Sequence, residues 1–175
     1  MEPSFWLGSP RRAPQTFWDY WNHMVSFEPT RAKAVGIAYY TAISVNPKEA
    51  EDPGLVDETL SRIEEYLDRE PVIAIGEIGF NNTTPNEERA FRKQLQIAVR
   101  RNMPIMIHTP HVNKLKGTIR TVEILKEMNV PPHLVDIDHC TEETMPTART
   151  FEGCWCGMTV YPTKLSAERA AKLVQ

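Results

Sequence analysis

Three short apolar segments with the same layout recur along the chain and constrain its fold. The segments PVIAIGE, PIMIH and PHLVDIDH each open on a proline and lead to a chemically reactive side chain, namely Glu77, His108 or His139. The interval from one of these side chains to the next is 31 residues both times. A strand, a helix and their two loops occupy about 30 residues or a little more. The period therefore predicts alternating strands and helices, with the strands parallel.

The shared position of these side chains at strand ends predicts a site. Barrel enzymes carry their chemistry at the carboxyl ends of parallel strands. One carboxylate and two imidazoles suit Zn²⁺, Mn²⁺ or Fe²⁺. A single histidine at a strand end is more often a hydrogen-bonded polar residue without a functional role. Three such groups at the same position relative to their strands favour a metal site. Asp136, Asp138 and Thr109 are candidates for fixing the imidazole tautomers. We also expect the glycines in GEIG to leave space for a ligand, although glycines are common in turns as well.

Composition sets broad limits on the chain. Its 175 residues are enough for one domain with a sizeable core. The net charge of −3 shows no basic excess of the kind that nucleic-acid binding leaves. No apolar run approaches the roughly 20 residues of a membrane span, and the N-terminus does not read as a signal peptide. Three cysteines argue against a disulfide framework, so we expect a reducing, cytoplasmic compartment.

Helix signals alternate with the apolar segments. Helices are predicted from Thr16 to about Phe27, from Asp52-Pro53, from Thr84-Pro85, from Lys114 to Met128, from Thr141, and from Ser166 to the end of the chain. The inward positions of the helix 114–128 are predicted to be Ile119, Val122, Leu125 and Met128. Further strands are predicted at residues 2–7, in YYTAISV and in WCGMTVY. This α/β pattern fits either an open doubly wound sheet or a (β/α)₈ barrel.

A second set of polar residues is expected near the same rim. The candidates for substrate binding are Asn46, His111, Arg11 and Arg12. The two arginines could hold an anionic group, and a solvated loop is an equally good interpretation. His23 and His133 are expected to be structural or surface residues. Cys154 and Cys156 lack the second ligand pair that a structural zinc site usually needs.

In their order and spacing, GEIG, IMIHTPH and VDIDHC resemble the motifs of the TatD-like metal-dependent hydrolases of the amidohydrolase superfamily. The resemblance covers essentially the whole chain. It implies a (β/α)₈ TIM-type barrel with a divalent metal ion, Zn²⁺, Mn²⁺ or Mg²⁺. It makes Glu77 the catalytic, metal-bridging carboxylate on strand four, and His108 and His139 metal ligands on strands five and six.

Two parts of the family pattern fall outside this chain. The H-x-H pair of strand one is expected before Met1, and the general-base aspartate of strand eight after Gln175. We therefore expect a single partial barrel domain over residues 1–175, from about strand two to helix seven. The first and last βα units are missing in this interpretation. We expect weak metal affinity and little turnover from the chain alone.

Other departures from the family pattern concern the substrate. Asn46 stands in place of a histidine, Asn81 in place of an aspartate and Pro110 in place of an arginine. Loss of the histidine and the arginine removes groups that could bind phosphate. We expect hydrolysis of a phosphoester or an amide- or ester-type bond in a small molecule, with nucleic acid less favoured. The alternative is a non-catalytic remnant or binding module with exposed barrel edges. A nucleotide-binding α/β domain is disfavoured by the lack of a glycine-rich phosphate loop.

Overall fold

The computed structural model describes residues 10–161 and 164–174. Five parallel strands form one sheet in the order β1-β2-β3-β4-β5. The strands are β1 Thr41–Ile43, β2 Val72–Gly79, β3 Ile105–His108, β4 Val135–Ile137 and β5 Trp155–Cys156. Each strand is added beside the one before it, whereas a doubly wound sheet reverses its order. The predicted α/β class is confirmed, and the strand order is that of a barrel.

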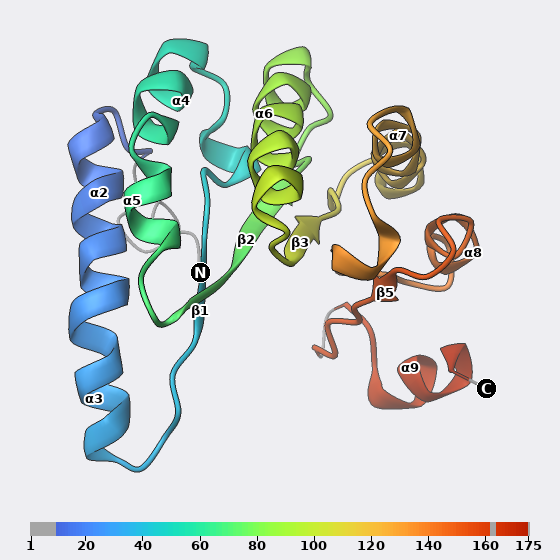
Figure 1. Cartoon of the computed structure of the whole chain (residues 1–175). Coiled ribbons are helices and arrows are strands. Elements are labelled where there is room, and N and C mark those ends of the chain that lie inside the picture. Colours follow the sequence, from blue (N-terminus) through green and yellow to red (C-terminus); the bar gives the residue numbers. More distant parts are fainter. Residues whose placement is uncertain (1–9, 162–163, 175) are drawn as a thin grey trace.

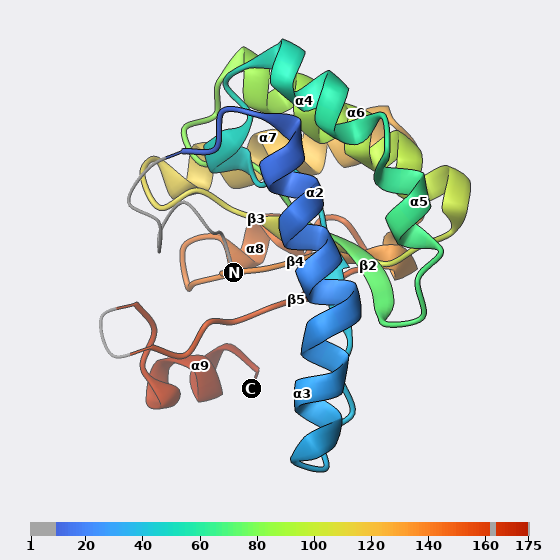
Figure 2. The ribbon, with the colours of Figure 1, turned by 90° about the vertical axis from the view of Figure 1, so that its left-hand side faces the viewer.

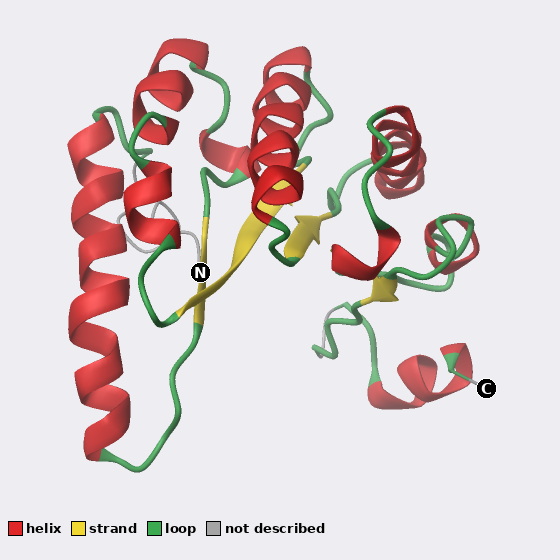
Figure 3. Cartoon of the chain, viewed as in Figure 1, coloured by secondary structure: helices red, strands yellow, loops and turns green. Residues whose placement is uncertain are grey.

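Helices follow the strands around the outer side of the curved sheet (Figures 1 and 3). They are α2 Pro14–Asn22, the π-helical turn η1 His23–Phe27, α3 Glu28–Ala34, η2 Pro47–Glu49, α4 Pro53–Leu60, α5 Ile63–Leu67, α6 Pro85–Arg101, α7 Lys114–Glu127, η3 Pro132–Leu134, α8 Met145–Ala148 and α9 Ala167–Leu173. Among the described residues β1 and β5 do not pair, so the barrel is not closed. Figure 2 shows the same layers after a quarter turn. No described helix has both the length and the apolar character to cross a membrane.

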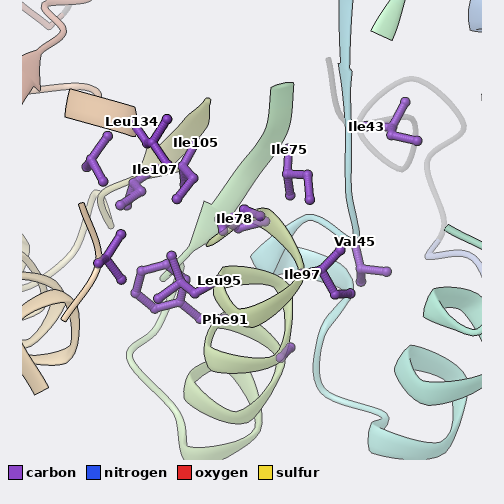
Figure 4. Close-up of a cluster of buried hydrophobic side chains, with 14 of the residues drawn as sticks. Ile43, Val45, Ile75, Ile78, Phe91, Leu95, Ile97, Ile105, Ile107 and Leu134 are labelled. Atoms are coloured by element: carbon purple, nitrogen blue, oxygen red, sulfur yellow. The ribbon is translucent and has the colours of Figure 1, made fainter. Parts of the chain in front are cut away.

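The core lies between the sheet and these helices. Ile75, Ile78, Phe91 and Leu95 are fully buried and lie in the cluster of Figure 4. The amide of Gln94 on α6 adds a polar link inside this layer. Its Oε1 accepts from the backbone N–H of Val45 at 2.8 Å, and its Nε2 donates to the Val45 carbonyl at 3.1 Å. Helix α6 is thereby joined to the segment that follows β1.

Helix α6 begins where its sequence signals predict. Thr84 is the N-cap, and its side chain and that of Glu87 form a reciprocal capping box. Pro85 occupies the first turn, where no intrahelical N–H bond is lost. The Glu87 carboxylate is buried and also accepts from the backbone N–H groups of residues 81–83. The loop after β2 is therefore fixed to the start of α6.

Other element boundaries differ from the prediction. Helix α2 starts at Pro14, and the Thr16 hydroxyl donates to the Ala13 carbonyl instead of capping. The helical path continues to Ala34 because the π-helical turn precedes Pro29, which then occupies a first-turn position of α3.

The C-terminal elements are shorter than predicted, and one inward position is wrong. In WCGMTVY only Trp155–Cys156 is a strand, and α9 ends at Leu173. The short helix after β4 is α8, which starts at Met145 and not at Thr141. Ile119 was expected to face inward but is 42% exposed. The predicted strand at residues 2–7 lies outside the described residues.

Candidate metal centre

The strands bring Glu77, His108 and His139 together at one edge of the sheet. Glu77 lies in β2, His108 is the last residue of β3, and His139 follows β4 by two residues. The ring centroids of His108 and His139 are 4.9 Å apart. The Nε2 atom of His139 is 3.5 Å from Oε1 of Glu77. The three side chains that the sequence period singles out therefore share one small region.

A fourth group, Asp138, joins this region and was predicted only as a supporting residue. Glu77, Asp138 and His139 each offer a ligand atom, and these atoms lie within 4.8 Å of one another. Asp138 immediately precedes His139 in VDIDHC. The chain turns after β4, with a positive φ of 63° at His139, and strand alternation does not predict the side-chain directions there. The sequence did contain one signal for Asp138, namely an acidic residue directly before a histidine at a strand end.

Hydrogen bonds orient both imidazoles. Nδ1 of His139 is 2.5 Å from the Thr159 hydroxyl oxygen, so its Nε2 is the atom that faces Glu77. Nδ1 of His108 is 2.9 Å from the backbone carbonyl of Thr109, to which it donates. This bond leaves Nε2 of His108 as the basic nitrogen for a ligand bond. Thr109 was predicted as such a partner, and its hydroxyl also donates to the Asp138 carbonyl at 2.9 Å.

Charge and burial put these groups in the protonation states that a cation requires. A hydrogen bond from His139 lowers the pKa of Glu77 to about 2, and this effect outweighs burial, which acts in the other direction. Burial lowers the pKa of His108 to about 3. At neutral pH Glu77 is therefore an anion and His108 a neutral imidazole. Metal binding needs ligands in these forms.

The two glycines of GEIG serve the packing of strands. A Cβ atom on Gly76 would lie 2.5 Å from Cβ of Met106, and one on Gly79 would lie 2.5 Å from the carbonyl oxygen of His108. Both clashes are with β3. The glycines thus let β3 approach β2 closely and bring His108 to Glu77, which differs from the expectation that they clear space for a ligand.

Asn46 and His111 lie at the site. Nδ2 of Asn46 donates to Oε2 of Glu77 at 3.3 Å. The hydroxyl of Ser44 donates to the Glu77 carbonyl at 2.9 Å. The exposed ring of His111 is 5.4 Å from that of His108 and 5.9 Å from that of His139, measured between centroids. Asn46 therefore orients Glu77, and His111 stands at the mouth of the site.

The two arginines have different environments. Arg11 is buried, and its Nε and Nη2 atoms donate to the Glu49 carboxylate at 2.8 and 2.5 Å. Its guanidinium also lies 3.6 Å above the Phe17 ring. Arg11 lines a small cavity together with Asn46 and Glu77. The charge of Arg11 is therefore paired with Glu49. Arg12, by contrast, is exposed to solvent.

Comparison with known proteins gives a consistent match. Residues 26–175 match the family model described as TatD related DNase. An uncharacterized metal-dependent hydrolase of Methanocaldococcus jannaschii is 34% identical over 163 residues, which is 93% of this chain and 63% of that protein. The 3'-5' ssDNA/RNA exonuclease TatD of Dickeya dadantii is 44% identical over 92 residues, which is 43% of this chain and 34% of that protein.

A solved structure agrees. The crystal structure of a TatD-like protein from Archaeoglobus fulgidus matches with a TM-score of 0.77 at 34% identity, over 86% of this chain and 62% of that one. The chain thus spans less than two thirds of the length of these relatives. The metal-dependent relatives and the clustered ligand atoms together support a divalent metal ion as the cofactor of this site.

Proposed function

Because this chain belongs to the TatD family, we propose that it supplies a metal centre for the hydrolysis of a phosphoester bond. The observation that carries the proposal is the convergence of Glu77, Asp138 and His139 within 4.8 Å, with His108 beside them. Two carboxylates and two imidazoles are a donor set that suits a divalent ion such as Zn²⁺ or Mn²⁺. A bound ion would act as a Lewis acid toward water and the substrate oxygen.

The residues around the ion have separate tasks. Asn46 donates to the Glu77 carboxylate, which lies beside His139, and Ser44 donates to the Glu77 backbone carbonyl. The Thr109 carbonyl and the Thr159 hydroxyl hold the two imidazoles in the orientation that leaves Nε2 of each toward the centre. Such supporting bonds matter because ligand geometry tunes both metal affinity and reactivity.

A phosphoester is preferred over an amide for two reasons. One relative is named as a nuclease for single-stranded DNA and RNA, whose scissile bonds are phosphodiesters. The cationic side chains of Lys114 and Lys164 also line a cavity next to His139. Asn46 and Pro110 replace two groups of the family pattern that could hold phosphate, so we propose that the substrate differs from that of this nuclease.

Metal binding by the purified chain tests the centre directly. After treatment with a chelator, Zn²⁺ or Mn²⁺ is titrated calorimetrically into the parent, Glu77→Gln, His139→Gln and His133→Gln. His133 is exposed in η3, at the start of β4, and provides a matched control. We expect each of the first two variants to weaken binding at least tenfold, and His133→Gln to leave it unchanged. Equal affinity in all four proteins would contradict the proposed centre.

Hydrolysis is measured on the same proteins. With metal bound, we expect the chain alone to cleave bis(p-nitrophenyl) phosphate slowly but still faster than Glu77→Gln does, and both proteins to cleave p-nitrophenyl acetate at equal rates. A Glu77-dependent rate on the acetate ester with none on the phosphodiester would instead favour a carboxylic ester or amide substrate.

A further inference from the structure

A second cavity lies beside the candidate metal centre, on the other edge of the His139 ring. Its volume is about 160 Å³. Its polar lining comprises His111, Lys114, His139, Thr141, Thr159 and Lys164. Thr159 and the carboxylate of Asp138 lie 2.5 and 3.3 Å from Nδ1 of His139, whereas Glu77 lies 3.5 Å from Nε2. A group bound in this cavity would therefore lie beside the candidate metal centre, across the His139 ring from Glu77.

Lys114 has two hydrogen-bond acceptors among the described residues and three N–H donors. Its Nζ donates to the Thr109 hydroxyl at 2.8 Å and to the Pro110 carbonyl at 3.3 Å. Both acceptors are neutral, and an ammonium group has three N–H donors. Lys114 is half-buried, and the cost of burying its charge lowers its pKa. A half-buried ammonium with neutral partners favours the arrival of an anion.

Lys164 adds a second positive charge. It repels Lys114 and contributes to lowering the pKa of both Lys114 and His111. Neither lysine forms an ion pair with a carboxylate in the part of the chain that the structure describes. The carboxylates of Asp138 and Glu143 act on Lys114 only at longer range. The arrangement contrasts with the outer helix surface, where Arg89, for example, pairs with Asp57.

The chemistry of the lining selects the kind of anion. An arginine fork matches both carboxylates and phosphates bidentately, whereas a lysine binds phosphate as a point charge. Two ammonium groups and the Thr141 hydroxyl provide donors in several directions, which suits a tetrahedral group. Pro110 stands here in place of the arginine of the family pattern. Lys114, four residues later, places its ammonium group against the backbone of Pro110.

We propose that this lysine cavity binds a non-reacting phosphoryl group of the substrate, next to the bond that is cleaved. The proposal rests on the proposed function for its link to catalysis. The substrate class it implies is a compound with at least two phosphoryl groups, one at the metal and one at the lysines. Specificity would then come from Lys114 and Lys164 and not from the arginine that the family pattern places on this strand.

Phosphate binding without metal tests the proposal. Inorganic phosphate is titrated calorimetrically into the chelator-treated chain and into Lys114→Gln and Lys164→Gln. Lys116→Gln on α7 and Lys172→Gln on α9 are the matched controls, because both lysines are exposed and carry the same charge. We expect each cavity variant to weaken phosphate binding roughly tenfold, with both controls unchanged. Acetate, tested in the same way, should bind more weakly than phosphate to the parent.

Three outcomes would overturn the proposal: no phosphate binding by the parent at millimolar concentration, equal affinity in all four variants, or acetate binding as tightly as phosphate. Circular dichroism confirms that each variant is folded. Because these titrations contain no metal, their result is independent of the metal titrations with Glu77→Gln. A failure of the lysine cavity can therefore be distinguished from a failure of the metal centre.

Discussion

The loops after β2 and β3 are each held by a charged side chain from the first turn of the following helix, but they use that charge differently. In the first loop the buried Glu87 carboxylate collects backbone N–H groups from residues 81–84. In the second loop the acceptors of Lys114 among the described residues are the Thr109 hydroxyl and the Pro110 carbonyl, and Lys114 also lines a cavity. The Glu87 carboxylate thus accepts several hydrogen bonds from the backbone, whereas the Lys114 ammonium group has fewer partners than it has N–H donors.

This difference in hydrogen bonding suggests a structural role for Glu87 and a ligand-binding role for Lys114. A buried carboxylate with several N–H partners stabilises the fold, and its removal leaves those donors unsatisfied. An ammonium group that retains a free donor costs the fold little when it is removed, and it remains available for a ligand. The following predictions test this distinction, beginning with the largest expected effect.

Replacing Glu87 with alanine should destabilise the chain most. The loss of charge-assisted hydrogen bonds to residues 81–84 should lower the free energy of unfolding by roughly 3 kcal/mol. Urea unfolding followed by circular dichroism measures the change. Glu152→Ala is the control, since Glu152 is exposed. A loss no larger than that of the control would mean that the loop after β2 does not depend on this carboxylate.

Gly117→Ala tests the point where α7 meets both loops. A Cβ atom there would lie 2.3 Å from Cγ of Pro110 and 3.1 Å from the Thr83 hydroxyl oxygen. Alanine normally stabilises a helix relative to glycine, but here the clash should cost about 1–3 kcal/mol. Gly54→Ala in α4 is the matched control, because a Cβ atom on Gly54 would lie at an ordinary 3.4 Å from Oδ1 of Asp52. Thermal unfolding should give opposite signs for the two variants, and equal shifts would contradict the packing.

Lys114→Gln should change stability by less than about 1 kcal/mol, because both acceptors of Lys114 are neutral and the new side-chain amide can donate to them in place of the ammonium group. Urea unfolding of Lys114→Gln and Glu87→Ala under the same conditions compares the loss of unfolding free energy in the two variants. If the lysine variant lost as much stability as the glutamate variant, Lys114 would be a structural residue and the contrast between the loops would fail.

The smallest effect is expected on the outer helix surface. Asp57 accepts from Arg89 and Lys93, each at 2.6 Å, and the hydrogen bond from Arg89 is the main cause that lowers its pKa to about 2 from 3.8. A depressed pKa contributes stability above pH 3.8 and loses it as the pH falls through 2. Because Asp57 is substantially exposed, Asp57→Asn should cost less than about 1 kcal/mol at pH 7.

Urea unfolding of the parent and Asp57→Asn across pH 2 to 7 measures this effect. The difference in unfolding free energy should shrink as the pH falls toward 2. A difference that stayed constant over this range would mean that the pair contributes no pH-dependent stability.

Much of the fold could be predicted because its signals are local. Thr84-Pro85 and Glu87 specify the start of α6 through groups three residues apart, and the structure has them in the predicted roles. The regular interval between apolar segments likewise predicts the parallel strands. The continuation of the helical path beyond Phe27 was missed because Pro29 follows a π-helical turn and lies in the first turn of α3, and a pattern of single residues does not reveal that turn.

The candidate site was predictable in part. The period places Glu77, His108 and His139 at one edge, and the structure brings them together. Asp138 and Lys114 were harder to assign, because their roles depend on how the chain turns after a strand. Lys114 reads in the sequence only as the first residue of a helix. Its neighbour Lys164 is 50 positions away, and only the folded chain brings the two charges together.

The amide of Gln94 ties the backbone of Val45 to α6 on both its N–H and its C=O. Asn46, the next residue, holds the Glu77 carboxylate. A chain of hydrogen bonds and one peptide unit therefore connects α6 to the Glu77 carboxylate. If Glu77 binds the proposed ion, a substitution that moves α6 should also shift that carboxylate, even when the substituted residue is far from the site.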